Sequence, residues 1–327
     1  MNEWGKVKKV VVGIADKSQF CPPCPGNLHI NWAEYDKNWP IPYGTFSQTI
    51  IDEANEDLEN LANVYKQFGA EVVRPAFNSS VRNFQYLYCP RDFVTKIHNK
   101  VIASPMSVNG RKDEIKSLGI KVDYDLSTQE FDHRDYNDYC IQNEKVLSTN
   151  NLKPMWDAAN ILRAGRNIIY LLSNTGNLAG AVQLQELLGP KTEFKVHVLQ
   201  NVYAFSHIDS TIALLKPGMM LVNPARVKKE KLPKFLQSWD IIESPMYDEM
   251  DYHGKYPMMS KWCNLNLTSL DEKTLIVNSS QPTTIKFLEK LGFTVVPVLM
   301  RHQRTLGGGP HCCTSELDRE YELDWYF

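Results

Sequence analysis

The residues best suited to covalent chemistry lie near the C-terminus, in the segment 306–314, which reads LGGGPHCCT. Three consecutive glycines permit unusual backbone dihedrals and close approach of other groups. A cysteine at the end of such a loop can be accessible and activated as a thiolate nucleophile. The alternatives are a tight turn with buried thiols and, less favoured, a phosphate-binding loop, because the Lys and Ser/Thr of that motif are missing.

Four polar residues are candidates to act with Cys312, and each lies at the edge of a predicted hairpin. His207 and Asp209 would share one face of an extended segment, whereas Asp157 and Asp92 each directly precede a strand-like run. Taken singly, such residues are more often structural histidines or turn formers. Together they could form a Cys/His/Asp site, with Asp92 and Asp209 pairing with a cationic planar group such as a guanidinium.

The elements that must position these residues form a loose internal repeat. A hairpin pattern of two short apolar runs around a tight turn recurs four times, in the ranges 93–106, 160–174, 212–223 and 265–278. A segment of helical character and a β-rich run follow the last three hairpins, and the helical segments include 227–239 and 282–292.

The N-terminal part contains the same pieces further apart. A strand-like run at 7–15 is followed by a long loop, a helical segment at 50–69 and a short β-rich run. Five ββαβ-like units that are each too small to bury an apolar face predict one propeller-like α/β domain over residues 1–327. A doubly wound sheet is the alternative, but no G-x-G-x-x-G follows the first strand. The segments 16–49 and 119–156 fit the repeat poorly and are expected to be irregular insertions that act as lids or binding loops.

Composition narrows the class of protein. The 327 residues carry 36 Lys and Arg against 38 Asp and Glu, so the net charge of −2 provides no global field for nucleic acid or an anionic membrane. No run of about 18 apolar residues and no signal peptide is found, and seven cysteines fit free thiols in a reducing compartment. We therefore expect a cytoplasmic protein that binds small molecules. The Cys21-Pro-Pro-Cys24 spacing could suit zinc, but no second ligand pair is apparent, so no metal is expected.

Five motifs together resemble the arginine:glycine amidinotransferase family, which belongs to the guanidino-group-modifying enzymes. The resemblance spans about Val7 to Thr314 and rests on CPRDF (89–93), PMWDAANILRAGRNIIY (154–170), FSHIDSTIALLKPGMMLVNPAR (205–226), MMSKWCNLNLTSLDEK (258–273) and MRHQRTLGGGPHCCT (300–314). It implies a five-bladed, pseudo-symmetric α/β propeller of ββαβ units. It also implies ping-pong transfer of the amidino group of L-arginine to an amine, with release of ornithine and without a cofactor.

The resemblance also implies a role for each matching residue. Cys312 is similar to the nucleophile that forms an amidino-cysteine intermediate, His207 to the general acid and base, and Asp157 to the carboxylate that orients the histidine. Asp92 and Asp209 match the guanidinium clamp. Arg226 matches the arginine that holds the carboxylate of the donor. Cys313 occupies a position that is commonly Trp in the family.

Some positions on the acceptor side depart from the glycine-using members. Ser206 replaces a methionine, Ala204-Phe205 replaces an Asn-Pro pair, and Met259-Ser260 replaces a Ser-Ser pair. These departures argue against glycine as the acceptor but do not affect arginine as the donor. Two other interpretations stay open: a hydrolase of the arginine deiminase kind, with water as acceptor and citrulline and ammonia as products, and a non-catalytic guanidino-binding protein. A homodimer is a family-level expectation.

Overall fold

A computed structural model describes residues 1–31, 41–78, 84–137, 147–254 and 256–326. Parts of both predicted insertions, 32–40 and 138–146, lie outside the described residues. The described part of the chain contains no helix that is long and apolar enough to cross a membrane.

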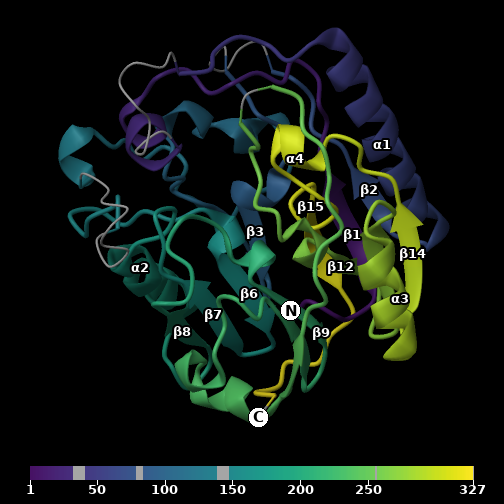
Figure 1. Cartoon of the computed structure of the whole chain (residues 1–327). Helices are drawn as coiled ribbons and strands as arrows, with labels where there is room; N and C mark the ends of the chain where they lie inside the picture. The colour runs from purple at the N-terminus through teal and green to yellow at the C-terminus, as the bar shows by residue number, and fades with distance from the viewer. Residues whose placement is uncertain (32–40, 79–83, 138–146, 255, 327) are drawn as a thin grey trace.

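Five three-stranded sheets form the framework (Figure 1). In chain order their strands are β15-β1-β2 (Thr314–Arg319, Val7–Val12, Glu71–Val73), β3-β4-β5 (Val94–Ile97, Lys100–Ala103, Tyr124–Asp125), β6-β7-β8 (Ile161–Ala164, Asn167–Leu171, Lys195–Leu199), β9-β10-β11 (Ile212–Lys216, Met219–Val222, Asp240–Glu243) and β12-β13-β14 (Thr268–Ser269, Thr274–Asn278, Thr294–Val298).

All five sheets share one topology. The middle strand pairs antiparallel with one neighbour, which the hairpin supplies in four of the sheets, and parallel with the other. A parallel partner needs a crossover connection, and helices supply it in three of the units. The architecture is the predicted five-unit α/β propeller, and the four predicted hairpins are confirmed.

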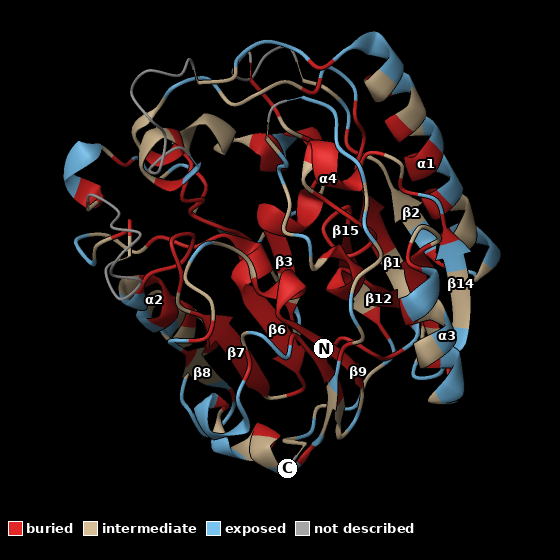
Figure 2. Ribbon diagram, in the orientation of Figure 1, coloured by how far each residue is buried: buried red, intermediate tan, exposed pale blue. Residues whose placement is uncertain are grey.

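Four α-helices are present among the described residues. They are α1 (Gln48–Gln67), α2 (Leu178–Leu188), α3 (Pro282–Lys290) and α4 (Gln303–Leu306). Ser47 and Asn177 cap α1 and α2 by accepting hydrogen bonds from backbone amides of the first turn, and Pro282 occupies the first turn of α3. These three helices bury one face against the sheets and expose the other, so the buried strands lie at the centre (Figure 2).

Three details differ from the sequence-based expectations. The N-terminal unit is completed by β15, which pairs antiparallel with β1, so the two ends of the chain close the ring. The range 227–239 holds two short 3₁₀ turns instead of an α-helix, because Pro233 lies between them and cannot continue a helical hydrogen-bond pattern. Strand β5 lies inside 119–156 and pairs with β4, so this range is not wholly an insertion.

A buried ion network ties four of the sheets together. Both carboxylate oxygens of Glu316 on β15 accept hydrogen bonds from Arg91 at 2.8 Å. Arg163 on β6 donates to Glu316 at 2.7 Å, Arg319 lies 3.0 Å away, and Thr268 on β12 donates at 3.1 Å. These donors hold the pKa of Glu316 well below its usual value, although burial opposes the shift. The negative charge of Glu316 is therefore compensated inside the protein.

Candidate active site

A tight turn leads into the first strand of every sheet. The turns are Pro90–Asp92 before β3, Ala158–Asn160 before β6, Ile208–Ser210 before β9, Cys263–Leu265 before β12 and 310–313 before β15. The first four contact one another in ring order. Because the sheets repeat around one axis, their entrance turns converge at one end of the molecule, and the predicted catalytic residues lie on these turns or next to them.

Cys312 lies on the turn before β15 and is fixed from two sides. Its Sγ accepts a hydrogen bond from Asn266 Nδ2 at 2.9 Å and donates to Asp209 Oδ2 at 2.9 Å. Asn266 Oδ1 also accepts from the backbone amides of Gly309, His311 and Cys312, each at 3.1 Å. One asparagine therefore positions both the thiol and the loop that carries it.

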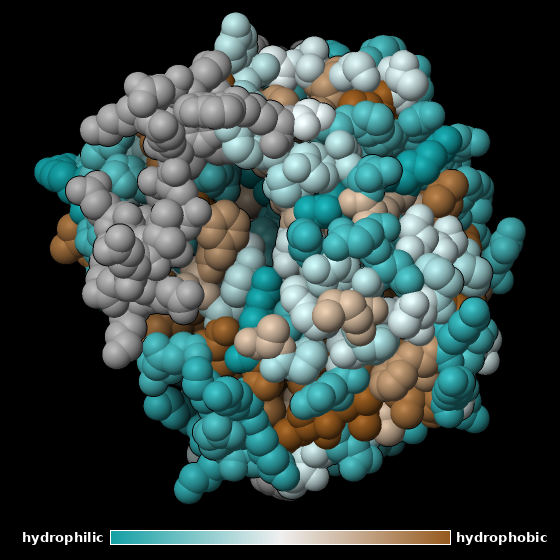
Figure 3. Space-filling view, in the orientation of Figure 1, coloured by the Kyte–Doolittle hydropathy of each residue, from teal (hydrophilic) through white to brown (hydrophobic). Residues whose placement is uncertain are grey.

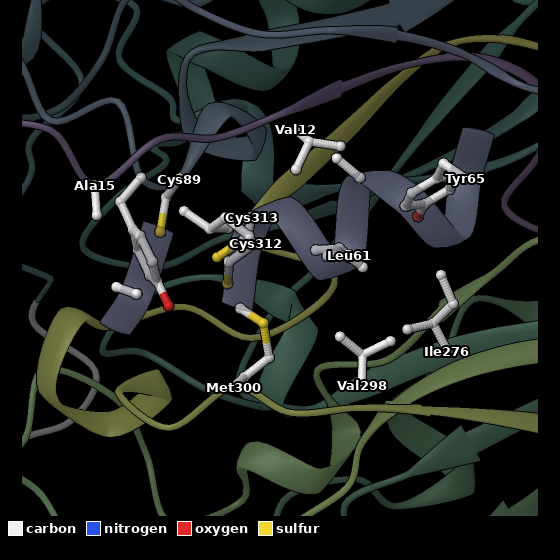
Figure 4. Packing of buried hydrophobic residues seen from close by; sticks show 14 of the residues in the cluster. Val12, Ala15, Leu61, Tyr65, Cys89, Ile276, Val298, Met300, Cys312 and Cys313 are labelled. Carbon is white, nitrogen blue, oxygen red and sulfur yellow. The ribbon is translucent and has the colours of Figure 1, made fainter. Parts of the chain in front are cut away.

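Three sulfur atoms are packed together beside this turn. Cys89, Cys312 and Cys313 lie close to one another in the apolar cluster that also contains Leu61 and Met300 (Figure 4). Cys312 alone of the two adjacent cysteines lines the cavity described below, whereas Cys313 is fully buried. A hydrogen bond with Cys89 raises the pKa of the Cys312 thiol well above its usual value, and burial and Asp209 add to the shift.

His207 lies between two carboxylates. Its Nε2 is 2.9 Å from Asp157 Oδ2, and its Nδ1 is 3.5 Å from Asp92 Oδ1. The other oxygen of Asp157 accepts hydrogen bonds from the backbone amide and the hydroxyl of Ser107, at 2.8 and 2.9 Å. Burial lowers the pKa of His207, but Asp92, Asp157 and Asp209 outweigh it and raise the value to about 9, so the imidazole is charged at neutral pH.

Asp92 is held by only one of its oxygens. Arg111 donates to Oδ2 at 2.6 Å. Its other guanidinium nitrogens donate mainly to Glu114, at 3.1 and 2.8 Å. The buried Oδ1 makes no hydrogen bond with the described residues. A buried carboxylate oxygen without a hydrogen bond is costly, so this oxygen suits a ligand that brings its own donors.

Asp209 contacts both Cys312 and a second histidine. Its Oδ2 accepts from Cys312 Sγ and lies 3.1 Å from His311 Nδ1. Burial raises the pKa of this carboxyl, but the hydrogen bond and charge of His311, together with His207, lower it to about 2. Asp209 is therefore an anion directly beside the sulfur.

The remaining predicted binding residues lie on one side of the site. Ser206 and Ser260 line the cavity. Arg226 does not line it; it lies behind the wall, where its guanidinium donates to Ser210 Oγ at 2.9 Å and Ser260 Oγ at 3.0 Å and stacks 3.7 Å over the ring of Tyr203.

These groups open into one cavity of about 470 Å³. Cys312, His207, Asp92, Asp157 and Asp209 all line it. The rest of the wall is mainly apolar and consists of Phe20, Phe46, Phe84, Tyr86, Val108, Tyr203, Phe205, Pro257, Met258, Met259 and Leu306, among others. The space-filling view shows a hollow near the middle of the molecule (Figure 3). Within the described ranges, no group of three or more His, Cys, Asp or Glu side chains is placed to hold a metal ion.

Sequence reasoning missed several residues of this site. Ser107 and Arg111 orient the two carboxylates beside His207, and neither stands in a recognisable motif. Asn266 lies inside the motif at 258–273, but nothing in the local sequence indicated that it would hold Cys312 and its loop. His311 lies inside the Gly-Gly-Gly motif, but nothing in the local sequence indicated that its ring would contact Asp209.

No model of a known protein family matches the chain, but individual known proteins are similar to it over nearly its whole length. The chain is 33% identical over 344 residues to inosamine-phosphate amidinotransferase 1 of Streptomyces glaucescens, with 99% of this chain and 97% of the relative covered. It is 28% identical over 359 residues to the L-arginine:L-lysine amidinotransferase of Pseudomonas savastanoi pv. phaseolicola, covering 99% of this chain and 95% of that protein.

Solved structures show the same relationship. The inosamine-phosphate amidinotransferase StrB1 of Streptomyces griseus superimposes with a TM-score of 0.91 and 30% identity, covering 99% of this chain and 97% of that one. DDAH from Pseudomonas aeruginosa, solved with citrulline, reaches a TM-score of 0.59 at 13% identity over 95% of this chain and all of its own. The second likeness concerns the fold alone.

Proposed function

The chain belongs to the amidinotransferase family, and from this premise we propose that it moves the amidino group of L-arginine to an amine acceptor by a ping-pong reaction that releases ornithine. The observation that carries the proposal is the convergence of the Cys312 thiol, the charged His207 and three carboxylates on one cavity. The donor is supported by the name of the arginine:lysine relative.

The carboxylates suit a guanidinium substrate. Asp92 and the anionic Asp209 lie on the cavity wall, and a planar cation with several N–H donors can pair with both carboxylates. The same cation would sit beside Cys312 Sγ. Its charge would lower the pKa of the thiol, so that the proton is released as the donor binds. The raised pKa of the Cys312 thiol is therefore compatible with a nucleophilic role.

The first half-reaction then follows from the positions of the groups. The Cys312 thiolate attacks the guanidinium carbon and forms a C–S bond. His207, which is charged and steadied by Asp157, gives its proton to the leaving nitrogen as the C–N bond breaks and ornithine departs. In the second half-reaction the neutral His207 removes a proton from the acceptor amine, which attacks the same carbon and releases the thiolate.

The residues that line the cavity favour one chemical class of acceptor amine. Among the described lining residues Arg111 is the only Lys or Arg, and its guanidinium already bonds Asp92 and Glu114. Phe205 and Met258 also line the cavity, and they are 40% and 37% exposed. This environment favours an amine with an apolar or uncharged body over a phosphorylated acceptor of the kind named for the Streptomyces relatives.

The test is intact-protein mass spectrometry after incubation with L-arginine and no acceptor, with ornithine and citrulline quantified in the same tube. We expect a covalent amidino adduct and stoichiometric ornithine, absent from Cys312→Ala and retained by the adjacent control Cys313→Ala. Continuous citrulline would instead support the hydrolase alternative. A panel of apolar and phosphorylated amines then identifies which class discharges the adduct.

A further inference from the structure

The Cys21-Pro-Pro-Cys24 segment lies at the cavity, and no step of the proposed reaction uses it. Cys21 lines the cavity wall, and both cysteines are partly exposed. The turn between them is fixed, since Asn27 Nδ2 donates to the carbonyl of Cys21 at 2.7 Å and the amide of Leu28 donates to the carbonyl of Cys24 at 2.9 Å. Two thiols are thus held near each other beside the cavity.

Both sulfur atoms lie beside the same backbone position. A Cβ placed on Gly110 would lie 2.5 Å from Cys21 Sγ and 3.9 Å from Cys24 Sγ. A hydrogen bond from Cys21 lowers the pKa of Cys24 to about 6; burial opposes the shift, and the amides of Asn27, Gly110 and Gly26 reinforce it. The same bond, with burial, raises the pKa of Cys21. The pair therefore contains one thiolate at neutral pH and one thiol beside it.

Gly110 belongs to a segment that orients both carboxylates next to His207. At one end of this segment Ser107 donates twice to Asp157 Oδ1. At the other end Arg111 donates to Asp92 Oδ2. A change at Gly110 would therefore be transmitted over three residues or fewer to each of the two groups that set the charge and orientation of His207.

We propose that Cys21 and Cys24 form a redox-sensitive thiol pair, and that its conversion to a disulfide by a low-molecular-weight disulfide slows the reaction in the adjacent cavity. The Cys24 thiolate attacks the small disulfide, forms a mixed disulfide and releases one small thiolate. Cys21 loses its proton to solvent and attacks Cys24 Sγ, which forms the Cys21–Cys24 bond and releases the second small thiolate. Two protein thiols are oxidised, and one small disulfide is reduced to two thiols.

The structural consequence follows from the geometry of a disulfide. Its sulfurs must come to about 2.05 Å, much closer than two hydrogen-bonded thiols. A disulfide sulfur is also a weaker acceptor than a thiolate, so the amides of Gly26, Asn27 and Gly110 lose their partner. We expect the segment 107–111 to loosen and the hydrogen bonds from Ser107 and Arg111 to weaken. The activity part of this inference rests on the proposed function.

The experiment uses the full chain in glutathione buffers of increasing oxidised fraction, with free thiols then blocked and the protein cut by trypsin. Both cysteines fall in one tryptic peptide, 18–37, which follows Lys17 and ends at Lys37. We expect this peptide to lose two hydrogens in oxidising buffer. Arginine-dependent ornithine release should fall about tenfold and recover with dithiothreitol.

Two variants separate this pair from the other thiols. In Cys24→Ser the ratio of oxidised to reduced activity should approach one, whatever its basal rate. Cys263→Ser removes a buried cysteine that does not line the cavity and should keep the response of the parent chain. A peptide 18–37 that keeps both thiols in oxidising buffer would overturn the inference, and so would a Cys24→Ser variant that loses activity as the parent does.

Amide hydrogen exchange provides a measure that does not depend on turnover. Faster exchange in 107–111 on oxidation supports the inference even if the reduced protein releases no ornithine, a result that would count against the proposed function only. A disulfide that forms without changing either exchange in 107–111 or turnover contradicts the inference.

Discussion

Two buried charged clusters in this protein use the same kinds of side chain in opposite ways. Around Glu316, carboxylates are surrounded by Arg91, Arg163 and Arg319, and both oxygens of Glu316 have donors. Around Cys312, three carboxylates share the cavity wall with His207, and Asp92 Oδ1 has no hydrogen bond with the described residues. The first cluster is internally compensated, and the second leaves negative charge for a cationic ligand.

The two clusters meet at consecutive residues. Arg91 donates to Glu316 and to the carbonyl of His311, whereas Asp92 faces the cavity. One short turn therefore supplies a cation to the compensated cluster and an anion to the open one. The compensated network therefore supports the loop on which the nucleophile lies. The cavity retains uncompensated negative charge, which is unfavourable for folding but favours binding of a cation.

The largest expected effect is on the nucleophile. Cys312→Ala should lower arginine-dependent turnover by about 10⁴-fold or more, because the variant lacks the thiol that bonds to the guanidinium carbon, while Cys313→Ala should stay within about threefold, because Cys313 does not line the cavity. Both rates can be measured by ornithine release, and thermal unfolding serves as the folding control. The reverse order of effects would remove Cys312 from the assigned role.

The next largest effect is on stability at the compensated cluster. Glu316→Gln leaves three buried arginines without their shared anion, so the free energy of unfolding should fall by about 3–5 kcal/mol. Denaturant titration with a fixed slope measures this loss. Asp92→Asn is the matched change in the open cluster and should alter stability far less. Equal losses from both variants would contradict the distinction between the clusters.

Asp92→Asn should act mainly on substrate binding. Removing the open carboxylate takes away a charge-assisted contact worth about 1.5–3 kcal/mol, which corresponds to a rise in KM for arginine of roughly 10- to 150-fold. The same change removes one of the anions that hold His207 charged, so the pKa of His207 should also fall. Steady-state kinetics at several pH values separate the two effects, and an unchanged KM would exclude Asp92 from the clamp.

The smallest effect concerns pH. The pKa of His207 is raised to about 9, so the proton needed by the leaving amine is present below that value and is lost as pH rises through it. Ornithine release in the first half-reaction should therefore decline above about pH 9. In Asp157→Asn the decline should begin at lower pH, since one anion is gone. A limb that does not move in this variant would show that another group controls it.

His207 also links pH to stability. Its pKa in the folded protein exceeds the ordinary value of 6.5, so its contribution to stability is complete below about 6.5 and disappears as pH rises through about 9. Asp209 has the opposite pH dependence, because its pKa is lowered to about 2. Its contribution to stability is complete above the ordinary carboxyl pKa and is lost as the pH falls toward 2.

Local signals in the sequence predicted both the architecture and the family. Four hairpin patterns and the more widely spaced N-terminal segments predicted five units and hence the propeller. The motifs at residues 89–93, 154–170, 205–226, 258–273 and 300–314 indicated the amidinotransferase family. These signals are local, because hairpins follow from short apolar runs and turn residues. The roles of the named site residues, the single domain and a homodimer remain predictions.

The closure of the ring and the positioning of the site depend on contacts between distant parts of the chain. β15 pairs with β1 from the other end of the chain, Ser107 and Arg111 orient Asp157 and Asp92, and Asn266 fixes the Cys312 loop. The hydrogen bonds of Ser107 and Asn266 join residues about 50 positions apart, and the pairing of β1 with β15 joins residues about 300 apart. Contacts of this kind leave no period or spacing in the sequence, because their partners become neighbours only after the sheets have assembled around a common axis.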